Sequence, residues 1–283
     1  MAAPKRPTVR TRGLAYELRV LRNQRNLTCR KAAEELGWQA SKLSRMETGQ
    51  QKIDVADVAS LLVLYKVRGQ ERARLLELAK RAEERGWWET ASPGLSNLSR
   101  TMIGFEADAV RITTFQLSLV PGLLQTADYT RALMRGGHVP AGEVEPRVVI
   151  RMGRQAILSR ESPPEYLAII DEAALRRRLG GTRLMARQLR HIVETAERPN
   201  VAVQVLPLSA EGHPGLDGPF TILNYTRGRS VVHLEHKISS LFLDKPEEVS
   251  VFSAAADTLR RTAMDPEQSV KFIEAVAWEL ERE

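Results

Sequence analysis

The sequence predicts a protein of two domains, an all-α domain of five short helices followed by a larger α+β domain. Three observations indicate this organisation. Apolar residues recur at helical spacing in residues 1–86, and residues 87–99 contain the Pro, Gly and Ser that are typical of a linker. In residues 100–283, short runs rich in β-branched residues alternate with helical patterns. We therefore expect the domain boundary to lie at this linker.

The five N-terminal helices are predicted from their apolar stripes and terminal residues. Residues 1–12 contain two prolines and no apolar period, so we expect a flexible basic arm there. The expected helices run, in order, from Leu14 to about Asn26, from the N-cap Thr28 to Gly37, from about Ala40 to Gly49, from the cap Asp54 onwards, and from about Gln70 to Arg85. Together they should form one compact bundle.

The second domain is predicted to mix helices and strands. The expected strands are Tyr166–Ile170, Val201–Leu206, Phe220–Tyr225, Val231–Glu235 and Leu241–Leu243. The expected helices are Glu172–Leu179, Arg183–Arg198, Glu247–Met264 and Pro266–Arg282, with further helical spacing around Met102 and Val148. This order of elements favours an α+β class over a regular βαβ repeat.

Composition restricts where the protein acts. Of its 283 residues 43% are hydrophobic, but no run approaches the ~20 apolar residues of a membrane-spanning helix. The N-terminus lacks the apolar core of a secretory signal. The single cysteine, Cys29, cannot form an internal disulfide and fits a reducing compartment. We expect a cytoplasmic protein without a membrane partner.

The positive charge of the chain is concentrated near its N-terminus. Residues 1–53 hold 12 Lys and Arg against 4 Asp and Glu, whereas residues 54–283 hold 30 against 31. A solvated charged face is the ordinary interpretation of scattered basic residues. Concentration in one small domain instead favours a polyanion, because Lys and Arg gain affinity by releasing counterions from phosphates. Double-stranded DNA is the partner that this pattern predicts.

Two short helices joined by a tight turn at Gly37 carry the functional signal. Such a pair can hold its second helix away from the domain, where it fits the major groove of DNA. Leu43 and Met46 should point into the bundle. The other face carries small, polar and cationic side chains that suit base contacts, namely Ala40, Ser41, Lys42, Ser44 and Arg45. The alternative is an ordinary exposed surface helix.

The segment Leu14–Val67 resembles the helix-turn-helix domain of the xenobiotic-response-element (XRE) type, the five-helix fold shared with phage repressors. The resemblance is carried by Leu27-Thr28, Ala32-Ala33, Leu36-Gly37 and Leu43-Ser44-Arg45-Met46-Glu47-Thr48-Gly49. It implies that Ala40, Ser41, Lys42, Ser44 and Arg45 face bases and that Thr28, Cys29, Gln50 and Lys52 face phosphates. The basic residues Arg30 and Lys31 are further candidates for phosphate contacts.

The resemblance also implies that Arg22 and Glu47 tie the third helix to the first, although from the residues alone they could equally be unrelated surface charges. Two positions depart from the pattern. Gln39 stands where Ser or Thr usually caps the recognition helix, so that either the first turn is less secure or Ser41 caps it. Cys29 stands where a Gln commonly contacts phosphate, which should weaken that contact.

The rest of the chain resembles the large C-terminal domain that accompanies this motif in many actinobacterial regulators. The matching pieces are Trp87-Trp88, Val120–Tyr129, Arg151-x-x-Arg154-Gln155, Asp171-Glu172-x-x-Leu175 and Pro199–Pro207. That domain has no settled chemistry. The resemblance implies an antitoxin-like regulator with a small toxin-like protein as partner.

No catalytic constellation, metal site or cofactor motif is predicted. On a strand, His233 and Glu235 face one way and His236 the other, which does not favour a metal site. Asp171 and Glu172 could form an acid–base pair, but capping of the following helix is the better interpretation.

The sequence therefore predicts a DNA-binding regulator without enzymatic activity. One helix-turn-helix domain buries too little surface for tight specific binding, so we expect a homodimer. Three roles stay open for the second domain: docking of the toxin-like protein, binding of a small effector, or an enzyme fused to the DNA-binding part. An exposed apolar patch would favour docking, and a pocket with convergent polar groups would favour an effector.

Overall fold

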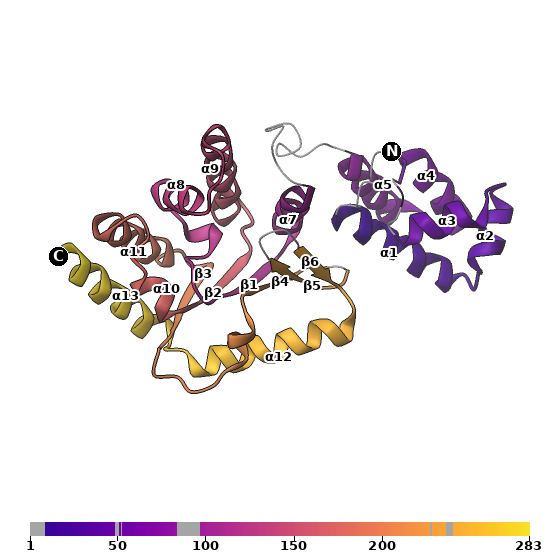
Figure 1. Cartoon of the computed structure of the whole chain (residues 1–283). Coiled ribbons are helices and arrows are strands. Elements are labelled where there is room, and N and C mark those ends of the chain that lie inside the picture. The colour runs from indigo at the N-terminus through magenta and orange to yellow at the C-terminus, as the bar shows by residue number, and fades with distance from the viewer. Residues whose placement is uncertain (1–8, 49–50, 52, 84–96, 227, 236–239) are drawn as a thin grey trace. The chain divides into compact units, whose positions relative to one another are not determined.

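A computed structural model describes residues 9–48, 51, 53–83, 97–226, 228–235 and 240–283 (Figure 1). The chain divides into two compact units. The first contains the N-terminal helices together with Ser99–Asp108, and the second contains the residues from Ala109 to the C-terminus. The structure thus combines a helical N-terminal region with an α+β region, which confirms the predicted fold class.

Five helices form the N-terminal bundle. They are α1 (Val9–Gln24), α2 (Cys29–Glu35), α3 (Ala40–Glu47), α4 (Val55–Leu64) and α5 (Gly69–Glu83). Their apolar stripes meet in one core, in which Leu14, Leu43 and Leu61 are completely buried. The expected arm is wrong in part, since residues 9–12 belong to α1. Residues 1–8 lie outside the described residues.

The helix starts of the bundle follow from their capping residues. Thr28 Oγ1 accepts a hydrogen bond from the N–H of Lys31 at 3.1 Å, and Asp54 Oδ1 accepts one from Ala56 at 2.9 Å. Each bond satisfies a backbone donor that has no partner within its helix. Gly37, at φ +66°, supplies the left-handed turn after α2. The two caps thus set where α2 and α4 begin, and Gly37 lies in the short turn that separates α2 from α3.

The predicted linker at 87–99 falls largely on residues 84–96, which lie outside the described residues. Its last three residues are helical, because α7 spans Asn97–Asp108. Met102 and Phe105 are buried on one side of this helix, as their spacing predicts.

The second unit is built on a six-stranded mixed sheet of order β3-β2-β1-β4-β5-β6. Its strands are β1 (Arg111–Gln116), β2 (Glu165–Asp171), β3 (Val201–Leu206), β4 (Phe220–Asn224), β5 (Val231–Glu235) and β6 (Ser240–Leu243). The first three strands are parallel, and β4 joins β1 in antiparallel orientation. Five strands match the prediction, whereas central strand β1 was not predicted.

Helices cover both faces of this sheet. They are α8 (Ala127–Gly136), α9 (Ala141–Gln155), α10 (Glu172–Arg176), α11 (Thr182–Ala196), α12 (Pro246–Thr262) and α13 (Pro266–Glu281), with short 3-10 turns at Gly122–Leu124, Ala156–Ser159 and Pro214–Asp217. In Figure 1, α8, α9 and α11 lie on one side of the strands and α12 on the other. The α12 side of the core contains Phe115, Phe220 and Leu259. Among the described helices, none combines the length and apolar character needed to span a membrane.

Candidate nucleic-acid interface

The two sides of α3 differ sharply in burial. Leu43 and Met46 are 0% exposed, which anchors the helix on the bundle core. Ala40, Ser41 and Ser44 are exposed on the other side, together with Arg45. The apolar side therefore leaves a face of small and polar side chains directed to solvent, as the sequence predicts.

A buried ion pair joins α3 to α1. Arg22 Nε lies 2.8 Å from Glu47 Oε1, and Arg22 Nη2 lies 2.9 Å from Oε2. Arg22 Nη1 also donates to the Leu27 carbonyl at 2.6 Å, in the turn before α2. The carboxylate of Glu47 raises the pKa of Arg22 by accepting the hydrogen bonds from Nε and Nη2. The predicted link is confirmed, and the alternative of unrelated surface charges is wrong.

Lys42 is held at the flank of α3 by two contacts. Its ammonium lies 2.8 Å from Asp57 Oδ1 of α4, and 4.0 Å from the centre of the Trp38 ring. A cation over an aromatic face beside a carboxylate is stabilised by both groups. Lys42 is therefore half-buried and directed toward α4, and its predicted base contact requires that this ion pair open.

Arg45 is exposed, and its side chain is oriented by one hydrogen bond. Arg45 Nε donates to Gln51 Oε1 at 3.2 Å. Within the described residues, neither terminal nitrogen of this guanidinium has a hydrogen-bond partner. Bidentate binding to guanine uses two guanidinium nitrogens, so this arrangement leaves suitable donors exposed.

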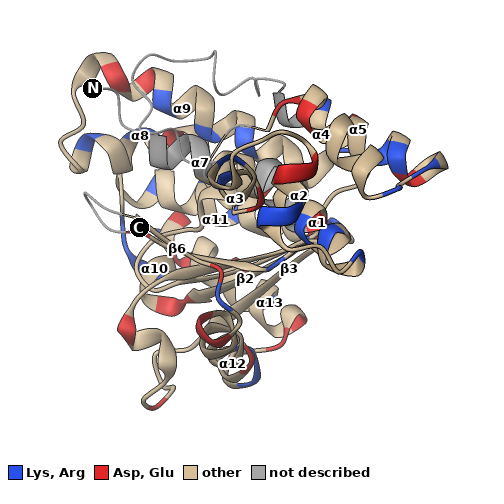
Figure 2. Ribbon diagram, turned by 90° about the vertical axis from the view of Figure 1, so that its right-hand side faces the viewer, with Lys and Arg blue, Asp and Glu red and all other residues tan. Residues whose placement is uncertain are grey.

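Apart from Cys29, the predicted phosphate-contacting residues divide into three groups. Arg30 and Lys31 are exposed on α2, and no described residue forms an ion pair with either. Thr28 is exposed, but its hydroxyl oxygen caps α2. Gln50 and Lys52 lie outside the described residues. Figure 2 shows blue segments of Lys and Arg on α1 and α2. The two free cations of α2 are therefore the described groups best placed to meet phosphates.

Cys29 and Gln39 are the two positions that depart from the XRE-type pattern, in which a Gln and a Ser or Thr are usual. Cys29 is half-buried, and its Sγ donates to the Ala40 carbonyl at 3.7 Å. Burial, followed by the negative charge of Glu47, raises the pKa of this thiol, which favours its neutral form. Gln39 is the N-cap of α3 without a side-chain capping bond. The cap is therefore not at Ser41, and the first turn of α3 lacks one stabilising contact.

The comparisons with protein families match both units. Residues 14–75 match a family model described as a helix-turn-helix domain. Residues 99–275, more than half of the chain, match the model described as domain of unknown function DUF5753. The chain belongs to the DUF5753 family. No curated protein and no solved structure matches it. The N-terminal bundle is thus a helix-turn-helix domain, and a DUF5753 domain follows it in the chain.

In the DUF5753 domain, the Val120–Tyr129 motif forms a loop held by buried amide and phenol groups. Gln125 Nε2 donates to the Val120 carbonyl at 2.7 Å, and the Tyr129 hydroxyl accepts from the Val120 N–H at 3.1 Å. Gln188 of α11 accepts from the Thr126 N–H and donates to the Leu124 carbonyl, both at 2.7 Å. These side chains satisfy buried backbone groups, so the motif is explained by the structure of the loop.

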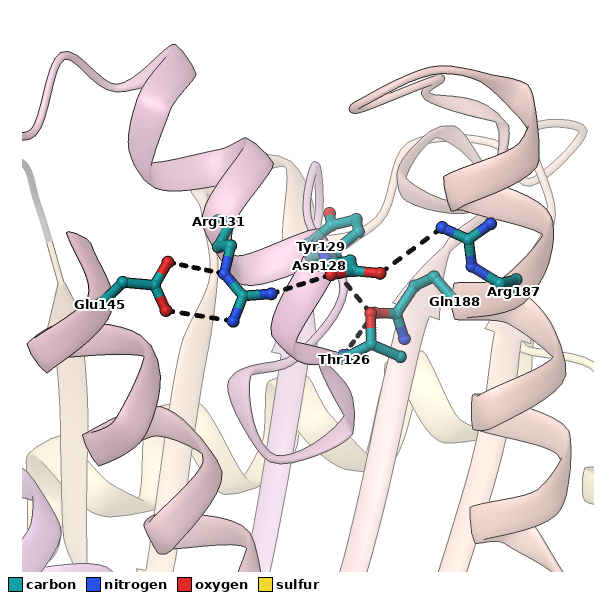
Figure 3. Close-up of polar contacts among 7 residues, drawn as sticks. All are labelled: Thr126, Asp128, Tyr129, Arg131, Glu145, Arg187 and Gln188. Carbon is teal, nitrogen blue, oxygen red and sulfur yellow. Dashed lines mark hydrogen bonds and ion pairs between the residues drawn. The ribbon is translucent and has the colours of Figure 1, made fainter. Parts of the chain in front are cut away.

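Charged residues join the helices above this loop. Arg131 of α8 contacts Asp128 at 2.9 Å and Glu145 of α9 at 2.7 Å, and Arg187 of α11 lies 3.5 Å from Asp128 (Figure 3). At least one partner of each pair is more than half exposed to solvent. Exposed ion pairs contribute little stability, so this network adds little to the stability of the domain.

In the DUF5753 domain, Asp171, Glu172 and His233 each make contacts that support the fold. Asp171 Oδ1 caps α10 by accepting from Ala173 N–H at 2.8 Å. Burial disfavours the ionised form of Glu172, but bonds from the Leu208 N–H and Arg176 lower the pKa of this carboxyl. His233 is buried and stacks on Phe242 with ring centres 4.7 Å apart. His236 lies outside the described residues, and in the described part of the chain no three candidate ligands gather around a metal-sized space.

Proposed function

We propose that this protein is a sequence-specific transcription regulator that binds double-stranded DNA through an XRE-type helix-turn-helix. The observation that carries this proposal is the two-sided burial of α3. Leu43 and Met46 hold one side on the core, while Ser41, Ser44 and Arg45 are exposed on the other. A helix that is fixed on one side and small and polar on the other suits close approach to base edges.

In the proposed complex, some exposed residues on and around α3 contact bases and others contact phosphates. Arg45 reads a guanine with its free guanidinium nitrogens, and Ala40, Ser41 and Ser44 permit close approach to neighbouring bases. Around this face, phosphate contacts set the position of the helix without reading the sequence. The proposed phosphate contacts are Thr28, Cys29, Arg30, Lys31, Gln50 and Lys52. Lys42 joins the base contacts when it leaves Asp57.

The proposed DNA-binding form is a homodimer. A single helix-turn-helix domain covers only part of one groove and buries little surface, whereas specific DNA interfaces are larger. Two copies would place their α3 helices in half-sites about 34 Å apart on one face of the duplex. The operator should therefore consist of two related half-sites.

The proposed role of the DUF5753 domain is regulatory and not enzymatic. Asp171 and Glu172, the residues closest to an acid–base pair, are already used in a helix cap and in bonds to Leu208 and Arg176. A small toxin-like protein as partner, and with it an antitoxin-like role, rests on the resemblance of the C-terminal motifs. The single neutral Cys29 thiol is compatible with action in the cytoplasm.

Selection of binding sites from genomic fragments with the intact protein tests this function. We expect the recovered fragments to share one motif composed of two half-sites about 10 base pairs apart. The control is a variant in which Ser41, Ser44 and Arg45 are all replaced by Glu, because carboxylates on this face repel phosphates. This variant should recover no motif. Recovery of the same motif by wild type and variant would exclude α3 as the reading helix.

A further inference from the structure

The α12 side of the sheet contains a groove that the DNA-binding proposal does not use, and part of the Pro199–Pro207 motif lines it. Its volume is about 750 Å³, within the range of small-molecule sites. The groove is lined by four strands of the second unit, β1 to β4, and by one side of α12. All its lining residues belong to the DUF5753 domain, so this domain forms the groove by itself.

The groove exists because α12 covers one row of side chains fully and the next row only in part, so that Leu167 and Ile222 of the second row both pack at the core and line the groove. Ile169, Phe115 and Phe220 are paired across β2, β1 and β4, and they pack with α12 in the core. Phe220 is in contact with Phe252 of α12, with ring centres 5.3 Å apart. This large aromatic row fills the space between the helix and the sheet.

The adjacent row has smaller side chains. It consists of Ala202, Leu167, Thr113 and Ile222, which are paired in that order across β3, β2, β1 and β4. Since side chains on a strand alternate between faces, this row lies on the same face as the aromatic row. Ser253 and Ala256 of α12 present small side chains at the facing wall. The result is a floor that is aliphatic except for the hydroxyl of Thr113 and that extends over four strands, about 14 Å at normal strand spacing.

Two charged side chains on the α12 wall have no partner in the described part of the chain. Asp257 and Arg260 are three residues apart, so they lie on the same side of the helix, and both are exposed. On the opposite wall Arg111 and Glu165 are already paired at 2.7 Å. The groove therefore offers one unpaired carboxylate and one unpaired guanidinium beside an apolar floor.

Gln204 of β3 adds an acceptor beside the end of α12. It is 6% exposed, and its Nε2 donates to the carbonyls of Met264 and Arg260 at 2.8 and 3.3 Å. Among the described residues none donates to its Oε1. The end of α12 carries the negative end of the helix dipole, which favours a cation nearby. Gln204 Oε1 and Asp257 are thus two acceptors for a ligand ammonium group.

We propose that this groove binds a small aliphatic zwitterion of the dipeptide kind. Its ammonium group bonds to Asp257 and Gln204, its carboxylate pairs with Arg260, and its side chains lie on Leu167 and Ile222. Such a ligand balances the charges of the groove, because its ammonium group pairs with the carboxylate of Asp257 and its carboxylate pairs with the guanidinium of Arg260. The termini of an extended dipeptide, about 7 Å apart, match the separation that two side chains on adjacent helical turns can reach.

Calorimetric titration of the full-length protein with three dipeptides, Leu-Leu, Ile-Val and Ala-Leu, tests the proposal. We expect saturable binding of at least one dipeptide below about 10 mM, the weak range of such small ligands. The same dipeptide with an acetylated N-terminus and an amidated C-terminus should bind at least about ten-fold more weakly, because it lacks both charges. DNA is absent, so failure of DNA binding would not affect this result.

Variants locate the site. Asp257→Asn and Arg260→Gln should each weaken dipeptide binding by about ten-fold or more. Arg261→Gln and Glu247→Gln, at exposed positions of α12 outside the groove, are matched controls that should leave the affinity unchanged. Ala202→Leu should abolish binding by filling the floor, with circular dichroism as the test of folding. Absence of saturable binding for all three dipeptides, or equal binding by wild type and both charge variants, would overturn the proposal.

Discussion

Arg22 of α1 and Glu47 of α3 form a two-point ion pair whose side chains are only 10% and 4% exposed. The same guanidinium donates to the Leu27 carbonyl. Arg22 therefore connects the first helix, the turn before α2 and the end of α3. In the proposed mechanism this connection fixes the angle at which α3 leaves the bundle.

Replacement of one partner of this pair should destabilise the bundle strongly. Glu47→Gln leaves the buried Arg22 charge without its carboxylate, which typically costs about 3–5 kcal/mol. Native-state hydrogen exchange at the α1 and α3 amides measures this loss locally. The control is Glu71→Gln, at a carboxylate that is 47% exposed and pairs with Arg74, and it should cost less than about 1 kcal/mol. Similar costs for the two variants would contradict the anchoring role.

The Lys42–Asp57 pair predicts a variant that binds DNA more tightly. Asp57→Asn should release the Lys42 ammonium for a phosphate or a base edge. One additional phosphate contact steepens the dependence of log affinity on log salt by about 0.9. Fluorescence anisotropy titrations at several salt concentrations measure this slope. In a Lys42→Ala background Asp57→Asn should have no effect, and weaker binding by Asp57→Asn alone would argue against this prediction.

The missing cap of α3 predicts a stabilising substitution. Gln39→Ser introduces a hydroxyl that can accept from the first-turn N–H groups, which is worth about 1 kcal/mol. Exchange protection of the Ser41 and Lys42 amides should rise accordingly. Gln39→Ala should be nearly neutral, within about 0.5 kcal/mol, because the Gln side chain makes no capping bond. A large loss in Gln39→Ala would reveal a contact of Gln39 that the structure does not contain.

Cys29 should tolerate the residue that the pattern favours. Cys29→Gln should keep the fold and leave DNA affinity unchanged or higher, because an amide donates to phosphate better than a neutral thiol. The thiol contact to Ala40 is long, at 3.7 Å, so its loss costs little. Circular dichroism and anisotropy titration measure the two effects, with Cys29→Ala as the control for removal of the thiol. Loss of folding in both variants would assign Cys29 a packing role.

Local sequence patterns predicted most of this fold. The caps Thr28 and Asp54 and the bounds of β3 and β5 follow from residues close in the chain. Strand β1 was missed because it begins directly after α7 and its pattern is short and polar at both ends. Its position depends on pairing with β2 and β4, whose residues lie about 50 and 110 positions later.

In the candidate site, too, some features follow from local sequence and others depend on contacts between distant segments. Exposure of Ser41, Ser44 and Arg45 follows from the helical period that buries Leu43 and Met46. By contrast, the bonds of Lys42 to Asp57 and of Arg45 to Gln51 depend on how α3 meets the elements after it. The groove beside α12 depends on the alignment of four strands, and no local pattern marks it.

The central claim is that Arg45 reads a base, and a comparison of two single variants tests it most directly. Arg45→Ala and Lys52→Ala are titrated against the selected operator and its single-base variants at several salt concentrations. Arg45→Ala should weaken operator binding by about 1–3 kcal/mol and remove the preference at one base pair per half-site. Lys52→Ala should weaken all sequences alike and lower the salt slope by about one unit. If Arg45→Ala weakens every sequence by the same factor, Arg45 contacts phosphate and α3 is not placed in the groove as proposed.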